Sequence, residues 1–175
     1  MDLIFLLALL TILANITLVI VLAVYFLKKT LWKNIEKLIV KNSIKYAFIV
    51  ALTATLGSLY LSEVRGFAPC RLCWFQRIFM YPQAVILGVA LIKKYKDALN
   101  YTFPLSLIGG IIAIYHYYLQ VFPNAYAPCA TVGFSISCNE RFFTYFGYIT
   151  IPWMSFTAFL LIALISFVSL KIFKD

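Results

Sequence analysis

Five long apolar runs constrain this chain more than any other feature of its sequence. They cover approximately residues 3–27, 46–64, 74–92, 101–121 and 148–170. Each is about 17 to 25 residues long, which is enough for a helix to cross a hydrocarbon core roughly 30 Å thick. A helix satisfies its own backbone hydrogen bonds in lipid, and the runs lack the two-residue alternation of barrel strands. The sequence therefore predicts an all-α membrane protein with five transmembrane helices.

The composition agrees with a membrane protein built as one bundle. Hydrophobic residues make up 64% of the 175 residues and charged residues only 12%, which is far from the average of soluble domains. No internal repeat and no serine- or glycine-rich linker divides the chain. We expect the first run to be a retained helix and not a secretory signal, because it has neither a basic start nor a small-residue cleavage site.

Lysines and arginines are divided between alternate connections of the five runs. Eleven lysines lie in residues 28–45, 93–97 and 171–175, whereas the four arginines lie in the other connections or at the start of the third run. Basic residues near span ends are retained in the cytoplasm, so we expect the N-terminus outside and the C-terminus inside. We therefore attribute the net charge of +9 to binding of anionic lipid on the cytoplasmic side and not to binding of nucleic acid. Residues 28–45 form either an interfacial helix or a solvated connector.

Four cysteines fall on the outer side of this predicted topology. Cys70 and Cys73 lie between the second and third runs, and Cys129 and Cys138 lie between the fourth and fifth. Disulfides persist outside the cytoplasm, and an even count in two close pairs indicates two pairs that can each be oxidised. The spacing fits two redox-active pairs, and it also fits two static disulfides that each cross-link a short loop.

The residues around the first pair favour reactive cysteines. Pro69 suits the first turn of a helix, so we expect the third helix to begin near Cys70. The backbone N–H groups at a helix N-terminus stabilise a thiolate, as do the nearby side chains of Arg71 and Arg77. A Cys-x-x-Cys pair whose second thiol, Cys73, is made acidic is suited to exchange.

Three polar side chains lie inside the apolar runs. Arg77 follows Cys73 by four residues and therefore shares its helix face. His116 is the only histidine of the chain, and Gln120 follows it by one turn in the fourth run. Together they are candidates to line a pocket for an apolar cofactor with a polar head. Snorkelling of the arginine and ordinary packing of the histidine are the alternatives.

Three segments resemble the DsbB/BdbC family of membrane disulfide-bond formation proteins, especially its short-loop BdbC type. They are "LYLSEVRGFAPCRLCWFQRIFMYPQ", "IYHYYLQ" and "FGYITIPWMSFTAFLLI", and the resemblance spans roughly residues 46–170. It implies a DsbB-like bundle of four transmembrane helices in residues 46–175. Residues 1–45 would then add an extra N-terminal transmembrane helix and a basic cytoplasmic connector.

The resemblance implies a thiol oxidase that reoxidises a thioredoxin-like partner of the DsbA/BdbD type and passes two electrons to membrane quinone, either ubiquinone or menaquinone. Cys129 would be attacked by the partner, and Cys138 would exchange with Cys70. Cys73 would then be the thiolate that faces the quinone, with Arg77 stabilising negative charge on the ring.

The resemblance further implies that His116 and Gln120 line the quinone pocket, and that the protein lies in the bacterial plasma membrane with its cysteine loops outside. We expect no metal and no nucleic acid as a partner. Only eight residues separate Cys129 from Cys138, so the amphipathic segment of the long-loop branch is not expected. The alternative of another class is a structural membrane protein with two stapled loops, or one that binds zinc through its four thiolates.

Overall fold

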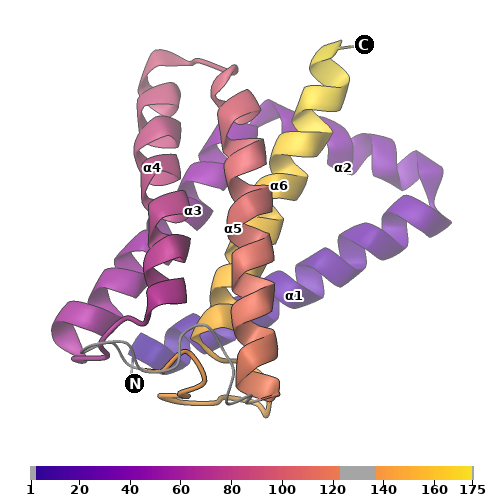
Figure 1. The fold of residues 1–175 in the computed structure, drawn as a ribbon. Helices are drawn as coiled ribbons and strands as arrows, with labels where there is room; N and C mark the ends of the chain where they lie inside the picture. The colour runs from indigo at the N-terminus through magenta and orange to yellow at the C-terminus, as the bar shows by residue number, and fades with distance from the viewer. Residues whose placement is uncertain (1–2, 123–136, 175) are drawn as a thin grey trace.

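The computed structural model describes residues 3–122 and 137–174, and helices account for most of them. Within this part of the chain there is no strand, and a π-helical turn over Tyr60–Val64 extends the third helix (Figure 1). The α-helices are α1 (Leu3–Leu27), α2 (Lys29–Lys41), α3 (Ser43–Leu59), α4 (Arg71–Lys93), α5 (Ala98–Val121) and α6 (Ile151–Lys174).

Within residues 3–122 and 137–174, five helical segments are long and apolar enough to span a membrane, as the sequence predicted. They are Leu3–Leu27, Ser43–Val64, Arg71–Lys93, Ala98–Val121 and Ile151–Ile172. The last begins three residues later than predicted, because a tight turn pairs Tyr145 with Ile149. Phe146 and Gly147 have positive φ angles of 53° and 79° in this turn, a conformation that a helix does not accept. The expectation of an all-α membrane protein is confirmed.

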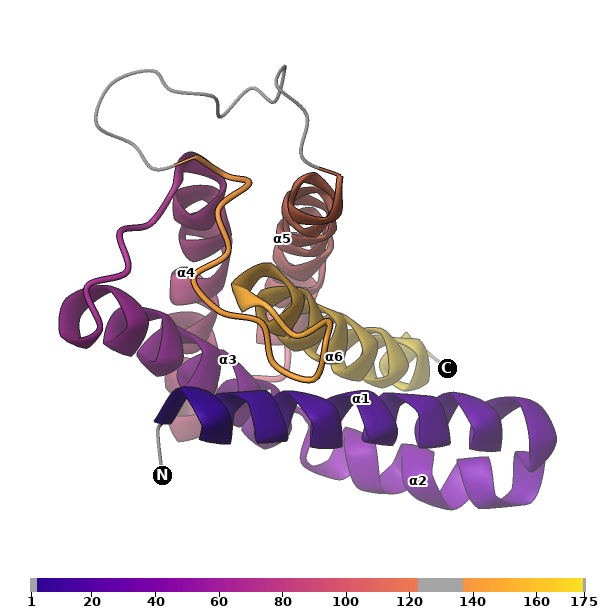
Figure 2. The same ribbon diagram turned by 90° about the horizontal axis from the view of Figure 1, so that it is seen from below.

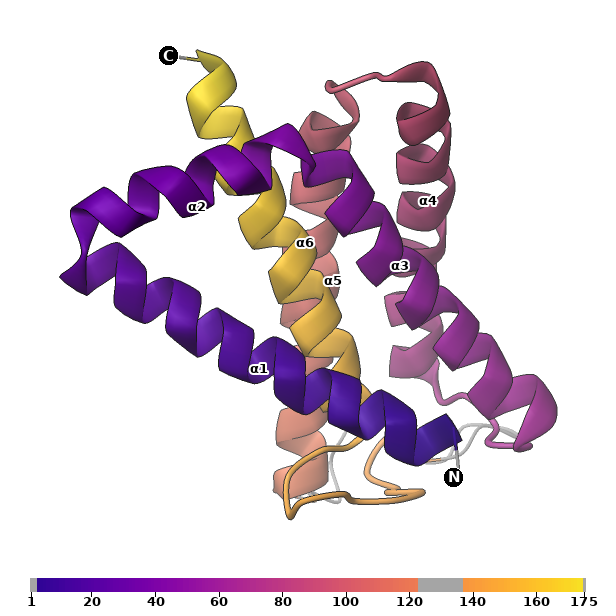
Figure 3. The ribbon, with the colours of Figure 1, turned by 180° about the vertical axis from the view of Figure 1, so that it is seen from behind.

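The helices α3, α4, α5 and α6 form a bundle, and α1 and α2 lie on one side of it. Figure 3 shows α1 crossing the face of the bundle that contains α3 and α6, and Figure 2 shows it on the side away from α5. The connector between the first two spans is therefore a helix, α2. The start of α1 and the loops before α4 and α6 lie at one end of the molecule, and the C-terminus lies at the other (Figure 1).

Small residues allow the helices of the bundle to approach closely. Ala47 and Ala51 of α3 are fully buried in the same apolar cluster as Leu87 of α4. A Cβ atom at Gly109 of α5 would lie 2.3 Å from the ring of Phe159 in α6, so only glycine permits this crossing. Close packing of small residues is the usual way in which membrane helices associate. This packing fixes how α4 and α5 are rotated about their axes, and these two helices carry the site described next.

Candidate active site

The first cysteine pair lies where α4 begins, as Pro69 indicated. The helix starts at Arg71, and Cys70 is its N-cap residue with extended backbone angles. The backbone N–H of Cys73 donates a hydrogen bond to the Cys70 sulfur at 3.4 Å, and the two sulfur atoms are 3.2 Å apart. Both cysteines are free thiols. The helix N-terminus therefore acts on the first thiol of the motif, whereas we expected it to acidify the second.

Cys70 is a thiolate at neutral pH in this arrangement. Its hydrogen bond with the Cys73 thiol is the largest contribution to lowering the pKa of Cys70, and contact with His116 lowers it further. Burial of Cys70 opposes these contacts by disfavouring the charged sulfur. The outcome is a pKa of about 4 for the Cys70 thiol, which gives the site a nucleophilic sulfur.

His116 connects this thiolate to the second cysteine loop. The histidine is only 2% exposed, and its Nε2 atom lies 3.1 Å from the backbone oxygen of Cys138 and 3.6 Å from the Cys70 sulfur. A carbonyl oxygen can only accept, so Nε2 carries the proton. The amide of Gln76 then donates to Nδ1 at 2.9 Å. The imidazole thus donates from Nε2 to the Cys138 carbonyl, and the same edge of the ring faces the Cys70 sulfur.

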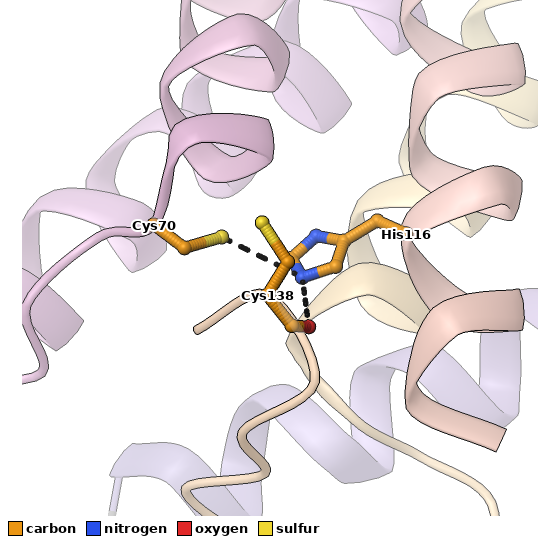
Figure 4. Close-up of side chains that lie close together, drawn as sticks. All are labelled: Cys70, His116 and Cys138. Atoms are coloured by element: carbon orange, nitrogen blue, oxygen red, sulfur yellow. Dashed lines mark hydrogen bonds between the residues drawn. The ribbon is translucent and has the colours of Figure 1, made fainter. Parts of the chain in front are cut away.

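The sulfur of Cys138 completes a cluster with Cys70 and His116. The two sulfurs and a ring nitrogen of the histidine all lie within 4.8 Å of one another, and Figure 4 shows the three side chains converging from α4, α5 and the loop before α6. Cys138 is 1% exposed and disulfide-bonded. A sulfur in a disulfide is not a thiolate ligand, so this donor set suits sulfur exchange better than a metal ion. Cys129 lies outside the described residues.

A cavity of about 310 Å³ adjoins the other side of the first cysteine pair. Cys73, Gln76 and Arg77 line it together with mainly apolar side chains from α1, α3 and α6. Cys70 does not belong to its described lining. The two sulfurs of the pair therefore face different surroundings, one toward the second loop and one toward the cavity.

Arg77 is held against α3 at the edge of this cavity. Its Nε atom donates to the hydroxyl of Ser58 at 3.0 Å, and a terminal nitrogen donates to the Ser58 carbonyl at 3.1 Å. Tyr81 donates to the same hydroxyl at 3.2 Å, and the Trp74 ring centroid lies 5.2 Å from the guanidinium carbon. A fixed guanidinium keeps its charge aimed at one place and is a good anion receptor.

Gln120 contacts the second cysteine loop, whereas we expected it to line a cofactor pocket together with His116. Its side-chain amide donates to the backbone oxygen of Glu140 at 2.9 Å, and Arg141 donates to the Gln120 backbone oxygen. These contacts hold the second loop against the outer end of α5. Among the described residues that line the cavity, neither Gln120 nor His116 occurs, so the arrangement groups His116 with the sulfurs and Gln120 with the loop.

Gln76 is the site residue that we did not single out from the sequence. It is 5% exposed, lines the cavity and donates to His116. It therefore joins the cavity to the cluster of Cys70, His116 and Cys138 by a single hydrogen bond. Its spacing of three residues from Cys73 placed it on the same helix face, and a glutamine inside an apolar run was the signal available.

We expect the thiolate of Cys70 to persist far below neutral pH. It should be protonated only as the pH falls through about 4, and replacing His116 by alanine should raise this pKa because a contact that favours the thiolate is lost. Ultraviolet absorbance of the thiolate, followed against pH in the reduced Cys129→Ser, Cys138→Ser protein, measures the transition. Adding Cys70→Ser should remove it. A transition only near about 8.5, the value of an ordinary thiol, would contradict this assignment.

Comparison with known proteins gives one family. Residues 41–169 match the profile described as "Disulfide bond formation protein DsbB". The chain is 42% identical over 127 residues to "Disulfide bond formation protein C" of Bacillus subtilis, covering 70% of this chain and 90% of that protein. It is 43% identical over 128 residues to "Probable disulfide formation protein C 1" of Bacillus cereus, covering 71% and 89%.

A more distant relative belongs to another bacterial group. "Probable disulfide formation protein" of Coxiella burnetii is 37% identical over 130 residues, which cover 74% of this chain and 88% of that protein. No solved structure has a significant match to the chain. The family match begins at residue 41, so α1 lies wholly before it.

Proposed function

This chain belongs to the DsbB family of disulfide bond formation proteins, and we propose that it is a membrane thiol:quinone oxidoreductase. Its substrate is the reduced dithiol of a thioredoxin-like protein of the DsbA/BdbD type outside the plasma membrane. Ubiquinone or menaquinone in the bilayer is the electron acceptor. The observation that carries the proposal is the division of the first cysteine pair, with Cys70 beside Cys138 and Cys73 beside Arg77 in the cavity.

The partner would transfer its electrons through the second loop. Its thiolate attacks Cys129, which forms a mixed disulfide and releases Cys138 as a thiolate. The second thiol of the partner then displaces Cys129, so that the partner leaves oxidised and the second pair is reduced. Cys138 next attacks Cys70 of an oxidised first pair, which releases Cys73. Attack by Cys129 on Cys138 restores the second disulfide and leaves the first pair as a dithiol. The separation of at most 4.8 Å between the Cys70 and Cys138 sulfurs supports this exchange.

The described side chains of the cavity fit a quinone. Apolar side chains form most of its wall, and Cys73, Gln76 and Arg77 lie together on the α4 side of it, as in sites that hold an apolar ligand by a polar head. A bound quinone would supply the oxidant, taking two electrons and two protons as the first pair returns to a disulfide. Cys73 delivers the electrons from inside the cavity, and the Arg77 guanidinium stabilises the negative charge that develops near it.

His116 and Gln120 have supporting roles in this proposal. His116 donates from Nε2 toward Cys70, and so favours the thiolate during sulfur exchange. Its Nδ1 atom is hydrogen-bonded to Gln76, which lines the cavity. His116 is therefore one hydrogen bond away from a residue that would contact the quinone. Gln120 holds the loop that carries Cys138 through its bond to Glu140.

The chain would then consist of two parts in the bacterial plasma membrane. Residues 46–175 form the four-helix unit shared with the family, and residues 1–45 add a helix and a basic connector. The lysine-rich segment 93–97 and the C-terminus lie at the end opposite the cysteine loops (Figure 1). By the preference of basic residues for the cytoplasm, that end faces inward and the N-terminus and cysteine loops face outward.

The test of the proposed function is quinone reduction by the purified protein in detergent. With a reduced thioredoxin-like donor and a short-chain ubiquinone or menaquinone, we expect the quinone absorbance to disappear at a rate proportional to the protein. One dithiol of the donor should be oxidised for each quinone that is reduced. A membrane protein with two stapled loops would give no turnover with either quinone, and that result with a folded protein and a competent donor would refute the proposal.

A further inference from the structure

The helix α1 is docked on the bundle by specific contacts, although it lies before the residues that match the family. The Thr157 hydroxyl of α6 donates to the side-chain oxygen of Asn15 at 3.1 Å. The Phe5 ring packs edge-on against Tyr145 with ring centroids 5.9 Å apart. A polar bond between two apolar helices is costly to separate in lipid, so α1 has a defined place on the bundle.

That place is the wall of the cavity that holds Cys73 and Arg77. Four residues of α1 line it, namely Leu7, Leu10, Thr11 and Ala14. Leu7 is three and four residues from Leu10 and Thr11, and these are four and three residues from Ala14, so the four side chains share one face of the helix. The same face approaches α3, where a Cβ atom at Gly57 would lie 3.2 Å from the Leu7 side chain.

The cavity also reaches the outer surface of the bundle beside α1. Leu10 of α1 and Ile49 of α3 line the cavity and yet are 43% and 49% exposed. In a membrane this surface faces lipid, so an apolar molecule dissolved in the bilayer can enter there. A ligand with a long apolar tail and a reactive head matches both this opening and the polar residues inside.

From these contacts we infer that α1 is a structural part of the quinone site, forming one wall of the cavity and one side of its opening to lipid. This inference rests on the proposed quinone-dependent function and extends it to a helix outside the family match. The residues of the shared four-helix unit leave this wall open, and α1 supplies apolar contact to a quinone that enters between itself and α3.

The test compares matched substitutions on α1. Ala14 lines the cavity and Ala23 is exposed on the same helix outside it, so Ala14→Phe and Ala23→Phe make the same change at the two kinds of position. In the same way Leu10→Ala is matched by Leu13→Ala, since Leu13 is 59% exposed and lies outside the described lining. The leucine pair removes atoms without risk of a clash.

The readouts are quinone binding and quinone kinetics. Binding of a short-chain ubiquinone and a short-chain menaquinone to the protein in detergent is measured by quenching of tryptophan fluorescence. We expect Ala14→Phe to raise the Kd by about tenfold, since an added ring overfills the cavity, and Leu10→Ala to raise it several-fold. The KM for quinone should rise with the Kd, while the KM for the reduced donor and both control variants stay at the wild-type values.

The outcomes separate this inference from the function on which it rests. If the wild type binds and reduces quinone but the cavity variants behave like their controls, α1 merely packs against lipid or bundle and the inference is wrong. If the wild type neither binds nor reduces quinone, the proposed function and the inference both fail. Ala14→Phe could instead unseat α1, but Leu10→Ala leaves the Asn15–Thr157 bond in place and gives an independent result.

Discussion

Replacing Cys73 by serine is expected to abolish quinone reduction, slowing it by at least about a thousandfold. Cys73 is the cysteine that lines the cavity with Arg77, whereas Cys70 is turned toward His116 and Cys138. Serine keeps the size of the side chain but is not a redox group, so the electron pair has no path into the cavity. The rate of quinone bleaching with excess reduced donor measures the loss, and retained turnover would exclude Cys73 as the electron-delivering sulfur.

The same variant should trap the exchange between the two loops. The Cys70 thiolate can attack the Cys138 sulfur, within 4.8 Å, to form a Cys70–Cys138 disulfide, and the proposed partner Cys129 leaves as a thiolate. Without Cys73 nothing within the first pair resolves this bond, and alkylating the released Cys129 thiolate prevents it from attacking Cys138 again. Peptide mapping by mass spectrometry should therefore find residues 70 and 138 joined in Cys73→Ser. Cys70→Ser is the control, since it also loses quinone reduction but cannot form the bond.

Replacing Arg77 by alanine is expected to lower kcat/KM for quinone by about tenfold to a hundredfold, since a hydrogen bond to a charged group contributes about 1.5–3 kcal/mol. The guanidinium is fixed by two bonds to Ser58 beside Cys73 in the cavity, so its loss removes a charge that favours reduction of a ligand there. Exchange between Cys70 and Cys138 takes place on the other side of the pair and should continue.

Two further variants test whether charge or geometry matters at Arg77. Lysine keeps the charge but cannot reproduce the two-point contact with Ser58, so Arg77→Lys should lie between wild type and alanine. Arg65 is an exposed arginine that follows α3, and Arg65→Ala should leave quinone kinetics unchanged. Equal kinetics in wild type and Arg77→Ala would show that the arginine only snorkels to the membrane surface.

Much of the fold was predictable because it depends on local patterns. Length and apolarity alone identified the five spans, since any such segment in lipid must close its own hydrogen bonds as a helix. The start of α4 followed from Pro69, which suits the first turn of a helix. The spacing of four residues between Cys73 and Arg77 put both on one face of α4, and they do line one cavity.

Local patterns were not sufficient to assign the two sulfurs of the first pair. Because α4 begins at Arg71, Cys70 is the N-cap residue and its sulfur accepts from a backbone N–H group. If the helix began a few residues later, the free N–H groups of its first turn would face another side chain. The apolar content of a sequence locates the first residue of a membrane helix only to within several residues, because the change from water to lipid at the interface is gradual. The structure therefore moved the stabilised thiolate from Cys73, where we expected it, to Cys70.

The five spans, the position of the four cysteines between those spans and the family of the motifs could all be read from the sequence, because each depends on neighbouring residues. Three contacts could be found only in the packed helices: His116 joins Cys70 to Cys138, Gln76 links them to a cavity, and α1 lines that cavity. These contacts depend on how each helix is rotated and tilted against the others. Packing between distant residues, such as Gly109 against Phe159, sets those angles, and no local pattern encodes them.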